Sequence, residues 1–148
     1  MVIDKSIHIL LVEDNPADIR LTQEAFKETS IPNRLHVVRD GAEALAFLEQ
    51  TGRFANAPRP DMILLDLNLP KKDGREVLAQ IKEKPEYKRI PVVILTTSNE
   101  EEDIAHTYEH HANCFITKPA ELDEFLNVVK NIESFWLSVV QLPNDNRL

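Results

Sequence analysis

The chain has 148 residues, 43% of them hydrophobic, and a formal net charge of -8 at pH 7, which suits one compact domain with a sizeable core. The single cysteine excludes an internal disulfide framework and a cysteine-based zinc site, and it favours a reduced, cytoplasmic protein. The acidic balance argues against nucleic-acid binding, and no apolar run is long enough to predict a signal peptide or a membrane span.

Short apolar runs alternate along the chain with segments of helical periodicity. The strands are predicted at residues 7–12, 35–38, 62–66, 90–95 and 114–117, and each is followed by a helix. The first helix is expected to run from Pro16 to about Thr29, and the last from about Leu122 to Val140. Strands that are apolar at every position are typical of a parallel sheet covered by helices on both faces.

Four helix starts carry capping signals, and one of them is Ser98 with Glu101 in capping-box spacing. Asn15 precedes Pro16 at the first helical position, while Asp40 and Asp73 are each followed three residues later by a glutamate. The segment 51–60, TGRFANAPRP, is predicted to be a loop.

Five strands alternating with five helices predict an α/β fold, a flavodoxin-like, doubly wound five-stranded parallel sheet with right-handed crossovers. We favour the strand order 2-1-3-4-5. In that order the first and third strands are neighbours at the topological switch point, where such sheets bind ligands.

Acidic residues follow those two strands. Glu13 and Asp14 come after the first strand, and Asp66 ends the third, so three carboxylates are expected in one crevice. Each could serve alone as a helix-entry or turn residue. Together they repel one another and favour a hard divalent cation, for which Mg²⁺ is suited because it takes one or two carboxylates, waters and phosphate oxygens.

Two further strand ends complete this chemistry. Thr96 supplies a hydroxyl after the fourth strand, and Lys118 supplies an ammonium group after the fifth. A carboxylate nucleophile, a cation and groups that bind phosphoryl oxygens are what the formation of an aspartyl phosphate needs.

These residues lie in the stretches LLVEDN, LLDLNLPKKDG, ILTTS and FITKP, whose order and spacing resemble the receiver domains of two-component response regulators. The resemblance covers about residues 6–130. We expect residues 1–148 to form a single receiver domain, with a C-terminal helical extension and tail over about 131–148.

The resemblance implies a role for each matching residue near the switch point. Asp66 would be the phosphoacceptor, and Glu13 and Asp14 the acidic pair that binds Mg²⁺. Asn68 would contribute its backbone carbonyl to the same ion. A phosphoacceptor of this kind is not an enzyme in its own right, beyond slow autodephosphorylation.

The resemblance also implies a conformational switch. Thr96 would be the switch hydroxyl, Lys118 the phosphoryl-binding lysine, and Phe115 the aromatic residue that turns inward as Thr96 moves. Thr97 departs from the family, which usually has alanine or glycine at that position.

Three longer stretches, PRPDMILLDLNLPKKDGREVL, KRIPVVILTTS and IESFWLSVVQLP, look like the small regulators served by bacterial, chiefly cyanobacterial, phytochrome histidine kinases. The expected upstream partner is therefore a histidine kinase that senses light. No DNA-binding output domain follows the last predicted helix, so we expect the phosphorylated form to act by binding a protein.

Two other functions use the same fold features. Haloacid-dehalogenase-type phosphatases also use an aspartyl nucleophile and magnesium, but they need a second aspartate two residues later, where this chain has Asn68. A flavodoxin-like flavin binder needs a phosphate loop, and Gly41, Gly52 and Gly74 form no glycine-rich motif.

The end of the chain remains apolar beyond the predicted core. Phe135, Val139, Val140 and Leu142 have no obvious place against the sheet, so they predict an exposed patch and a homodimer through the C-terminal helix. The alternative is an extension that folds back onto its own domain.

Overall fold

The computed structural model describes residues 6–28, 32–70, 73–96, 114–117 and 122–132. Strands and helices alternate along most of these ranges, with one 3₁₀ turn. The elements are β1 (Ile7–Val12), α1 (Pro16–Lys27), β2 (Asn33–Val38), α2 (Gly41–Glu49), η1 (Gly52–Phe54), β3 (Met62–Leu65), α3 (Gly74–Glu83), β4 (Val92–Thr96), β5 (Cys114–Thr117) and α5 (Leu122–Ile132).

All five strands form one parallel sheet in the order β2-β1-β3-β4-β5, which confirms the predicted topology. Strand β1 pairs with both β2 and β3, and Val12 lies opposite Leu65 at the end of the β1–β3 ladder. The carboxyl ends of β1 and β3 are therefore side by side at the switch point.

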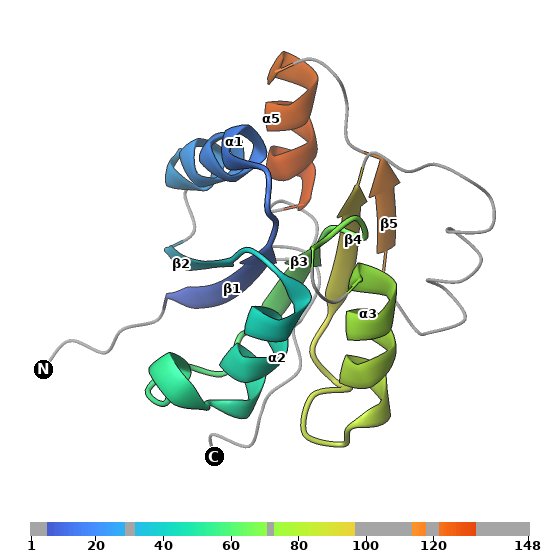
Figure 1. Cartoon of the computed structure of the whole chain (residues 1–148). Helices are drawn as coiled ribbons and strands as arrows, with labels where there is room; N and C mark the ends of the chain where they lie inside the picture. Colours follow the sequence, from blue (N-terminus) through green and yellow to red (C-terminus); the bar gives the residue numbers. More distant parts are fainter. Residues whose placement is uncertain (1–5, 29–31, 71–72, 97–113, 118–121, 133–148) are drawn as a thin grey trace, which may run out of the picture.

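Helices cover the sheet on both faces, as Figure 1 shows, with α2 and α3 on one side and α1 and α5 on the other. Alternate residues of one strand serve the two layers: Leu10 and Val12 pack with the α2–α3 layer, and Ile9 and Leu11 with the α1 layer. Because both faces are buried, the strands are apolar at successive positions, as the sequence indicated.

Two of the predicted caps start their helices as expected. The side chain of Asn15 accepts hydrogen bonds from the backbone N–H groups of Ala17 and Asp18, with Pro16 at the first helical position. Asp73 accepts from the backbone N–H of Arg75 at the start of α3. These bonds satisfy N–H groups that have no partner within the helix.

The start of α2 differs in detail from a reciprocal capping box. Asp40 accepts from the backbone N–H of Glu43 at 2.8 Å, as predicted. The Glu43 carboxylate accepts from the backbone N–H of Arg39 at 2.9 Å, one residue before the cap. Glu43 also pairs with Arg53 of η1. The Glu43 side chain therefore connects the residue before α2 with the 3₁₀ turn that follows α2.

Some predicted boundaries shift by a few residues. Helix α1 ends at Lys27 with Glu28 as its C-cap, whereas the sequence predicted an end near Thr29. Strand β2 begins at Asn33, because its ladder with β1 extends to the pair Ile7–Asn33. The helix predicted after β4 and the part of the last helix beyond Ile132 lie outside the described residues.

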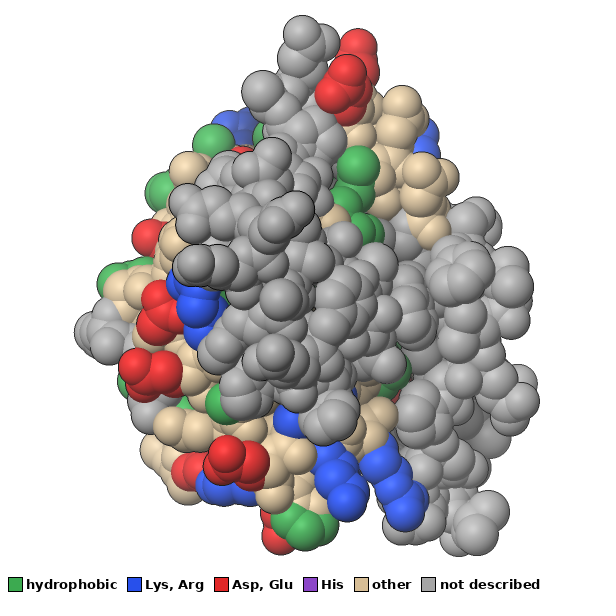
Figure 2. Space-filling view, turned by 90° about the vertical axis from the view of Figure 1, so that its right-hand side faces the viewer, with side chains coloured by type: hydrophobic (Ala, Val, Ile, Leu, Met, Phe, Trp, Pro, Cys, Tyr) green, Lys and Arg blue, Asp and Glu red, His purple; other side chains and the backbone are tan. Residues whose placement is uncertain are grey.

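Figure 2 shows a face of the molecule on which Lys and Arg side chains at the lower edge lie near acidic ones. Among the described residues, no helix has the length and apolar character needed to cross a membrane.

Candidate functional site

The predicted acidic crevice forms where β1 and β3 end. Glu13 and Asp14 follow β1 directly, and Asp66 follows β3 directly. The backbone N–H of Asp66 donates to the carbonyl of Val12 at 3.1 Å, which extends the ladder to the phosphoacceptor candidate itself. The sheet therefore sets the separation of the two acidic strand ends.

The three carboxylates converge although their exposure differs. One oxygen from each of Glu13, Asp14 and Asp66 lies within 4.8 Å of the other two. Glu13 is 2% exposed and Asp66 is 7% exposed, whereas Asp14 is exposed to solvent. Two of the three acids are thus buried, and the third is in contact with solvent.

Gathering three ionised carboxylates costs on the order of a few kcal/mol per pair at the effective dielectric of a protein surface. Carboxylate oxygens are hard ligands, and the described donor set contains no thiolate or imidazole. The group therefore fits a hard divalent cation, as the sequence analysis predicted.

The buried acid Glu13 is held by contacts with the backbone. The backbone N–H of Asn15 donates to the Glu13 carboxylate at 3.3 Å, and the Glu13 N–H donates to the Val38 carbonyl of β2 at 3.0 Å. Because Asn15 also caps α1, the helix start and the acidic side chain are fixed together.

A tight turn follows Asp66. The backbone N–H of Asn68 donates to the Asp66 carboxylate at 3.2 Å, and Leu69 donates to the Leu67 carbonyl at 3.2 Å. Asn68, whose carbonyl is predicted to bind the cation, is thus joined to the Asp66 carboxylate through its N–H.

The remaining predicted site residues are described only in part. Thr96 is the last residue of β4, which pairs with β3, so its backbone lies toward the same end of the sheet as Asp66. Phe115 lies in β5 opposite Ile94. The side chains of Thr96 and Phe115, and all of Lys118, lie outside the described residues.

Gly74 entered the sequence analysis only in the exclusion of a glycine-rich phosphate loop, yet it is a buried neighbour of the site. It is the first residue of α3, and its backbone N–H donates to the Leu67 carbonyl at 3.0 Å. The sequence carried one signal for this role. Gly74 directly follows the helix cap Asp73, a position at which most residues are tolerated and glycine is not needed for the helix.

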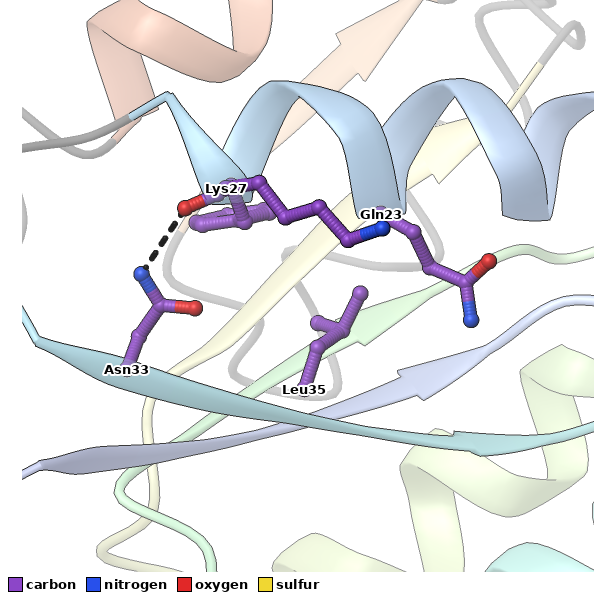
Figure 3. A pocket seen from close by; sticks show the side chains of 5 residues that line it. Gln23, Lys27, Asn33 and Leu35 are labelled. Atoms are coloured by element: carbon purple, nitrogen blue, oxygen red, sulfur yellow. Dashed lines mark hydrogen bonds between the residues drawn. The ribbon is translucent and has the colours of Figure 1, made fainter.

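Several surface hollows among the described residues lie away from the acidic residues, and two of them are comparatively large. The first, of about 280 Å³, lies between α1 and the start of β2, where Asn33 donates to the Phe26 carbonyl at 3.1 Å (Figure 3). The second, of about 420 Å³, borders β2, α2 and η1 and is lined by His36, Val37, Phe47, Arg53, Phe54, Asn56, Ala57 and Pro58. None of the acidic site residues lines either hollow.

Comparison with known proteins gives consistent results. A family model, the response regulator receiver domain, matches residues 9–130. Response regulator Rcp1 of Synechocystis sp. is 58% identical over 135 residues, which cover 91% of this chain and 92% of Rcp1. A crystal structure of the Mn²⁺-bound form of Rcp1 matches with a TM-score of 0.90 at 56% identity, over 93% of this chain and 99% of that one.

Two solved structures from phytochrome systems are also similar. The phosphorylated cyanobacterial phytochrome response regulator RcpA matches with a TM-score of 0.91 at 60% identity, over 94% of this chain and 99% of that one. The bacteriophytochrome response regulator AtBRR matches with a TM-score of 0.73 at 42% identity, over 93% and 100% of the two chains.

Proposed function

Because the chain belongs to the response regulator receiver domain family and thus to two-component phosphorelay signalling, we propose that Asp66 accepts the phosphoryl group. The observation that carries this proposal is the position of Asp66, 7% exposed at the carboxyl end of β3 and beside two further carboxylates. We propose one receiver domain over about residues 6–130, with residues 131–148 as an extension.

The proposed reaction transfers a phosphoryl group from a phosphohistidine of the kinase. An Asp66 carboxylate oxygen forms the new bond to phosphorus, and the bond from phosphorus to the imidazole nitrogen breaks. The leaving group is the imidazole of the kinase histidine, which takes up a proton. The Asn68 N–H, which donates to the Asp66 carboxylate, orients the nucleophile.

A divalent cation belongs to this proposal, and we assign it as Mg²⁺. Glu13, Asp14, Asp66 and the backbone carbonyl of Asn68 would hold it, since the three carboxylate oxygens lie within 4.8 Å of one another. When bound, such a cation neutralises the negative charge of the incoming phosphoryl oxygens. The existence of a Mn²⁺-bound form of the similar protein Rcp1 supports a divalent cation in this kind of protein.

Three further roles follow from position in the family motif. We propose Lys118 as the lysine that binds a phosphoryl oxygen, Thr96 as the switch hydroxyl and Phe115 as the switch aromatic residue. The haloacid-dehalogenase-type alternative has less support, because Asn68 occupies the place of its general acid and uses its backbone N–H to bind Asp66. The chain is thus a phosphoacceptor with slow autodephosphorylation at most.

The direct test is incubation with acetyl phosphate, with and without Mg²⁺, followed by intact mass. We expect one added phosphoryl group that requires Mg²⁺ and is lost in Asp66→Asn, because an amide is not a nucleophile here. The matched control is Asp123→Asn, an exposed acid on α5, which should be modified like the wild type. Equal modification of Asp66→Asn would contradict the assignment.

We propose a phytochrome histidine kinase as the upstream partner, in a cytoplasmic pathway, because RcpA and AtBRR are phytochrome response regulators. The test compares phosphotransfer from a bacterial phytochrome kinase, under red and far-red light, with transfer from a histidine kinase of another class. Faster transfer from the phytochrome kinase is expected. Equal or slower transfer would count against this partner.

We also propose a homodimer through the C-terminal helix, based on the apolar residues Phe135, Val139, Val140 and Leu142. Deleting residues 135–148 should give a monomer that is still phosphorylated at Asp66. A full-length protein that sediments as a monomer at tens of micromolar, with and without phosphoryl, would rule the dimer out.

A further inference from the structure

Gly74 lies in direct contact with the backbone that carries Asp66. A Cβ atom built on Gly74 would be 2.2 Å from the Asp66 carbonyl oxygen, 2.7 Å from Leu67 Cα and 3.0 Å from the Leu67 carbonyl oxygen. Ordinary contacts of this kind begin at about 3.4 Å, so a side chain of any size would force the two segments apart by roughly 1 Å.

The contacts around Gly74 connect the start of α3 to the Asp66 side chain. The Gly74 N–H and the Leu69 N–H both donate to the Leu67 carbonyl, at 3.0 Å and 3.2 Å. Within the same turn, the Asn68 N–H donates to the Asp66 carboxylate at 3.2 Å. A displacement at Gly74 is therefore passed to the groups that face the crevice.

The helix is not free to absorb this displacement by moving away. Val77, Leu78 and Ile81 of α3 are fully buried and pack in the same layer as Leu67 and the strands. Strand β3 is also fixed, because it pairs with β1 on one side and β4 on the other. The turn after Asp66 is the part that can yield.

From this geometry we propose that Gly74 is a positioning residue for the crevice: its missing side chain lets α3 hold the turn that orients the Asp66 carboxylate and the Asn68 carbonyl. The phosphoryl part of this inference rests on the proposed function, whereas the cation part does not. Glycine is required here by the close approach of two backbones, not by its backbone angles.

The test compares Gly74→Ala with two control variants of the full chain. Val77→Ala shortens a buried side chain of α3 and adds no atom at the close approach of Gly74 to the backbone of Asp66 and Leu67. Gly52→Ala introduces a side chain at a residue with φ of 59° and no heavy atom within 4 Å. The measurements are the dissociation constant for Mg²⁺, the initial rate of phosphorylation by acetyl phosphate, and the urea midpoint of unfolding.

We expect Gly74→Ala to weaken Mg²⁺ binding by about tenfold or more, the usual effect of losing support behind a metal ligand. Phosphorylation should slow by about a hundredfold, as expected for a misplacement near 1 Å. Val77→Ala should keep the wild-type affinity and rate although its urea midpoint falls. If Gly74→Ala matches Val77→Ala in both affinity and rate, the proposal is wrong.

A measurement on the wild type decides the matter if Gly74→Ala does not fold. Mg²⁺ should slow hydrogen exchange of the Gly74 N–H, which is bonded to Leu67, more than that of the Val77 N–H, which is bonded to Asp73. Equal protection of the two amides would overturn the proposal. Phosphorylation that persists in Asp66→Asn would instead refute the proposed function, and the Mg²⁺ data would still test Gly74.

Discussion

Strand β1 has a cluster of titratable groups near each end, and the two clusters differ in their hydrogen-bond donors and acceptors. Near its start, His8 Nδ1 and His36 Nε2 of β2 are 3.0 Å apart, with ring planes at 28° and centroids 5.2 Å apart. Beyond its end, Glu13 and Asp14 meet Asp66 with oxygens within 4.8 Å. A neutral imidazole is both a donor and an acceptor, whereas an ionised carboxylate only accepts.

The two histidines can therefore form a hydrogen bond with each other, because His8 Nδ1 and His36 Nε2 are 3.0 Å apart. One of the two nitrogens carries the proton and donates, and the other accepts. His36 also packs against Phe47 of α2, with ring centroids 5.5 Å apart. Burial, the nearby charge of His8 and that of Arg34 together lower the pKa of His36 below its ordinary value. The lesson is that donor and acceptor balance, more than proximity, distinguishes a structural cluster from an ion site.

The largest expected effect comes from removing one charge of the acidic cluster. At a Mg²⁺ concentration a hundred times the dissociation constant, the free energy of unfolding of the wild type should rise by about 2.7 kcal/mol. Asp14→Asn should lose most of this gain, because the ion loses a charged ligand, and it should be no less stable than the wild type without Mg²⁺, because repulsion falls.

Urea unfolding with and without Mg²⁺ measures both effects. Asp123→Asn, an exposed acid on α5, is the control and should keep the full gain. A gain in Asp14→Asn equal to that of the wild type would show that Asp14 does not hold the ion.

The second effect tests the histidine cluster. Because the folded pKa of His36 is lowered, the unfolded chain binds more protons just below pH 6.5, so this group's contribution to stability falls as the pH drops through that value. In His36→Leu this decline should be smaller, and the variant should lose about 1 kcal/mol at pH 7.5 with the hydrogen bond to His8.

Urea titrations of the wild type and of His36→Leu at pH 7.5 and pH 5 give the change of the free energy of unfolding with pH for each protein. The gain from Mg²⁺ should be unchanged in His36→Leu, since the two clusters are at opposite ends of β1. An identical pH dependence in the variant and the wild type would mean that His36 carries no such linkage.

The smallest effect concerns a single cation with no acid as its partner in the described hydrogen bonds. Lys82 of α3 donates to the carbonyls of Lys88 and Ile90, at 3.0 Å and 2.8 Å, and burial lowers its pKa to about 8. Between about pH 8 and the unfolded value of 10.5, the unfolded chain binds more protons, so this group makes stability rise with pH.

Lys82→Met should remove that rise while leaving the other lysines in place. The difference should stay below about 1 kcal/mol, because the Lys82 side chain is partly exposed and screened. Unfolding measured at pH 8 and pH 10 checks it, and a difference between variant and wild type that is constant with pH would refute the linkage.

Much of the fold could be predicted because its signals are local. Strands buried on both faces need continuous apolar runs, and Asn15, Asp40 and Asp73 cap their helices through bonds to residues two or three positions away. The acidic crevice followed from strand order alone, since β1 and β3 had to be neighbours at the switch point.

What the sequence could not give depends on distances through space. The proton-sharing contact requires the register of β1 and β2, in which His8 lies opposite Arg34 and reaches His36 diagonally. The close approach of Gly74 to Asp66 arises only when α3 packs against the turn after β3. In the sequence, the same position shows only an ordinary Asp-Gly pair.

The most direct test of the acidic crevice is a Mg²⁺ titration of the wild type followed by backbone amide NMR. We predict saturable shifts at Asn15, whose N–H donates to Glu13, and at Asn68, whose N–H donates to Asp66. The amide of His8, bonded to Asp61 at the other end of β1, should not move. Shifts spread evenly over all three, or no saturable shift at Asn15 and Asn68, would contradict a divalent-cation site formed by Glu13, Asp14 and Asp66.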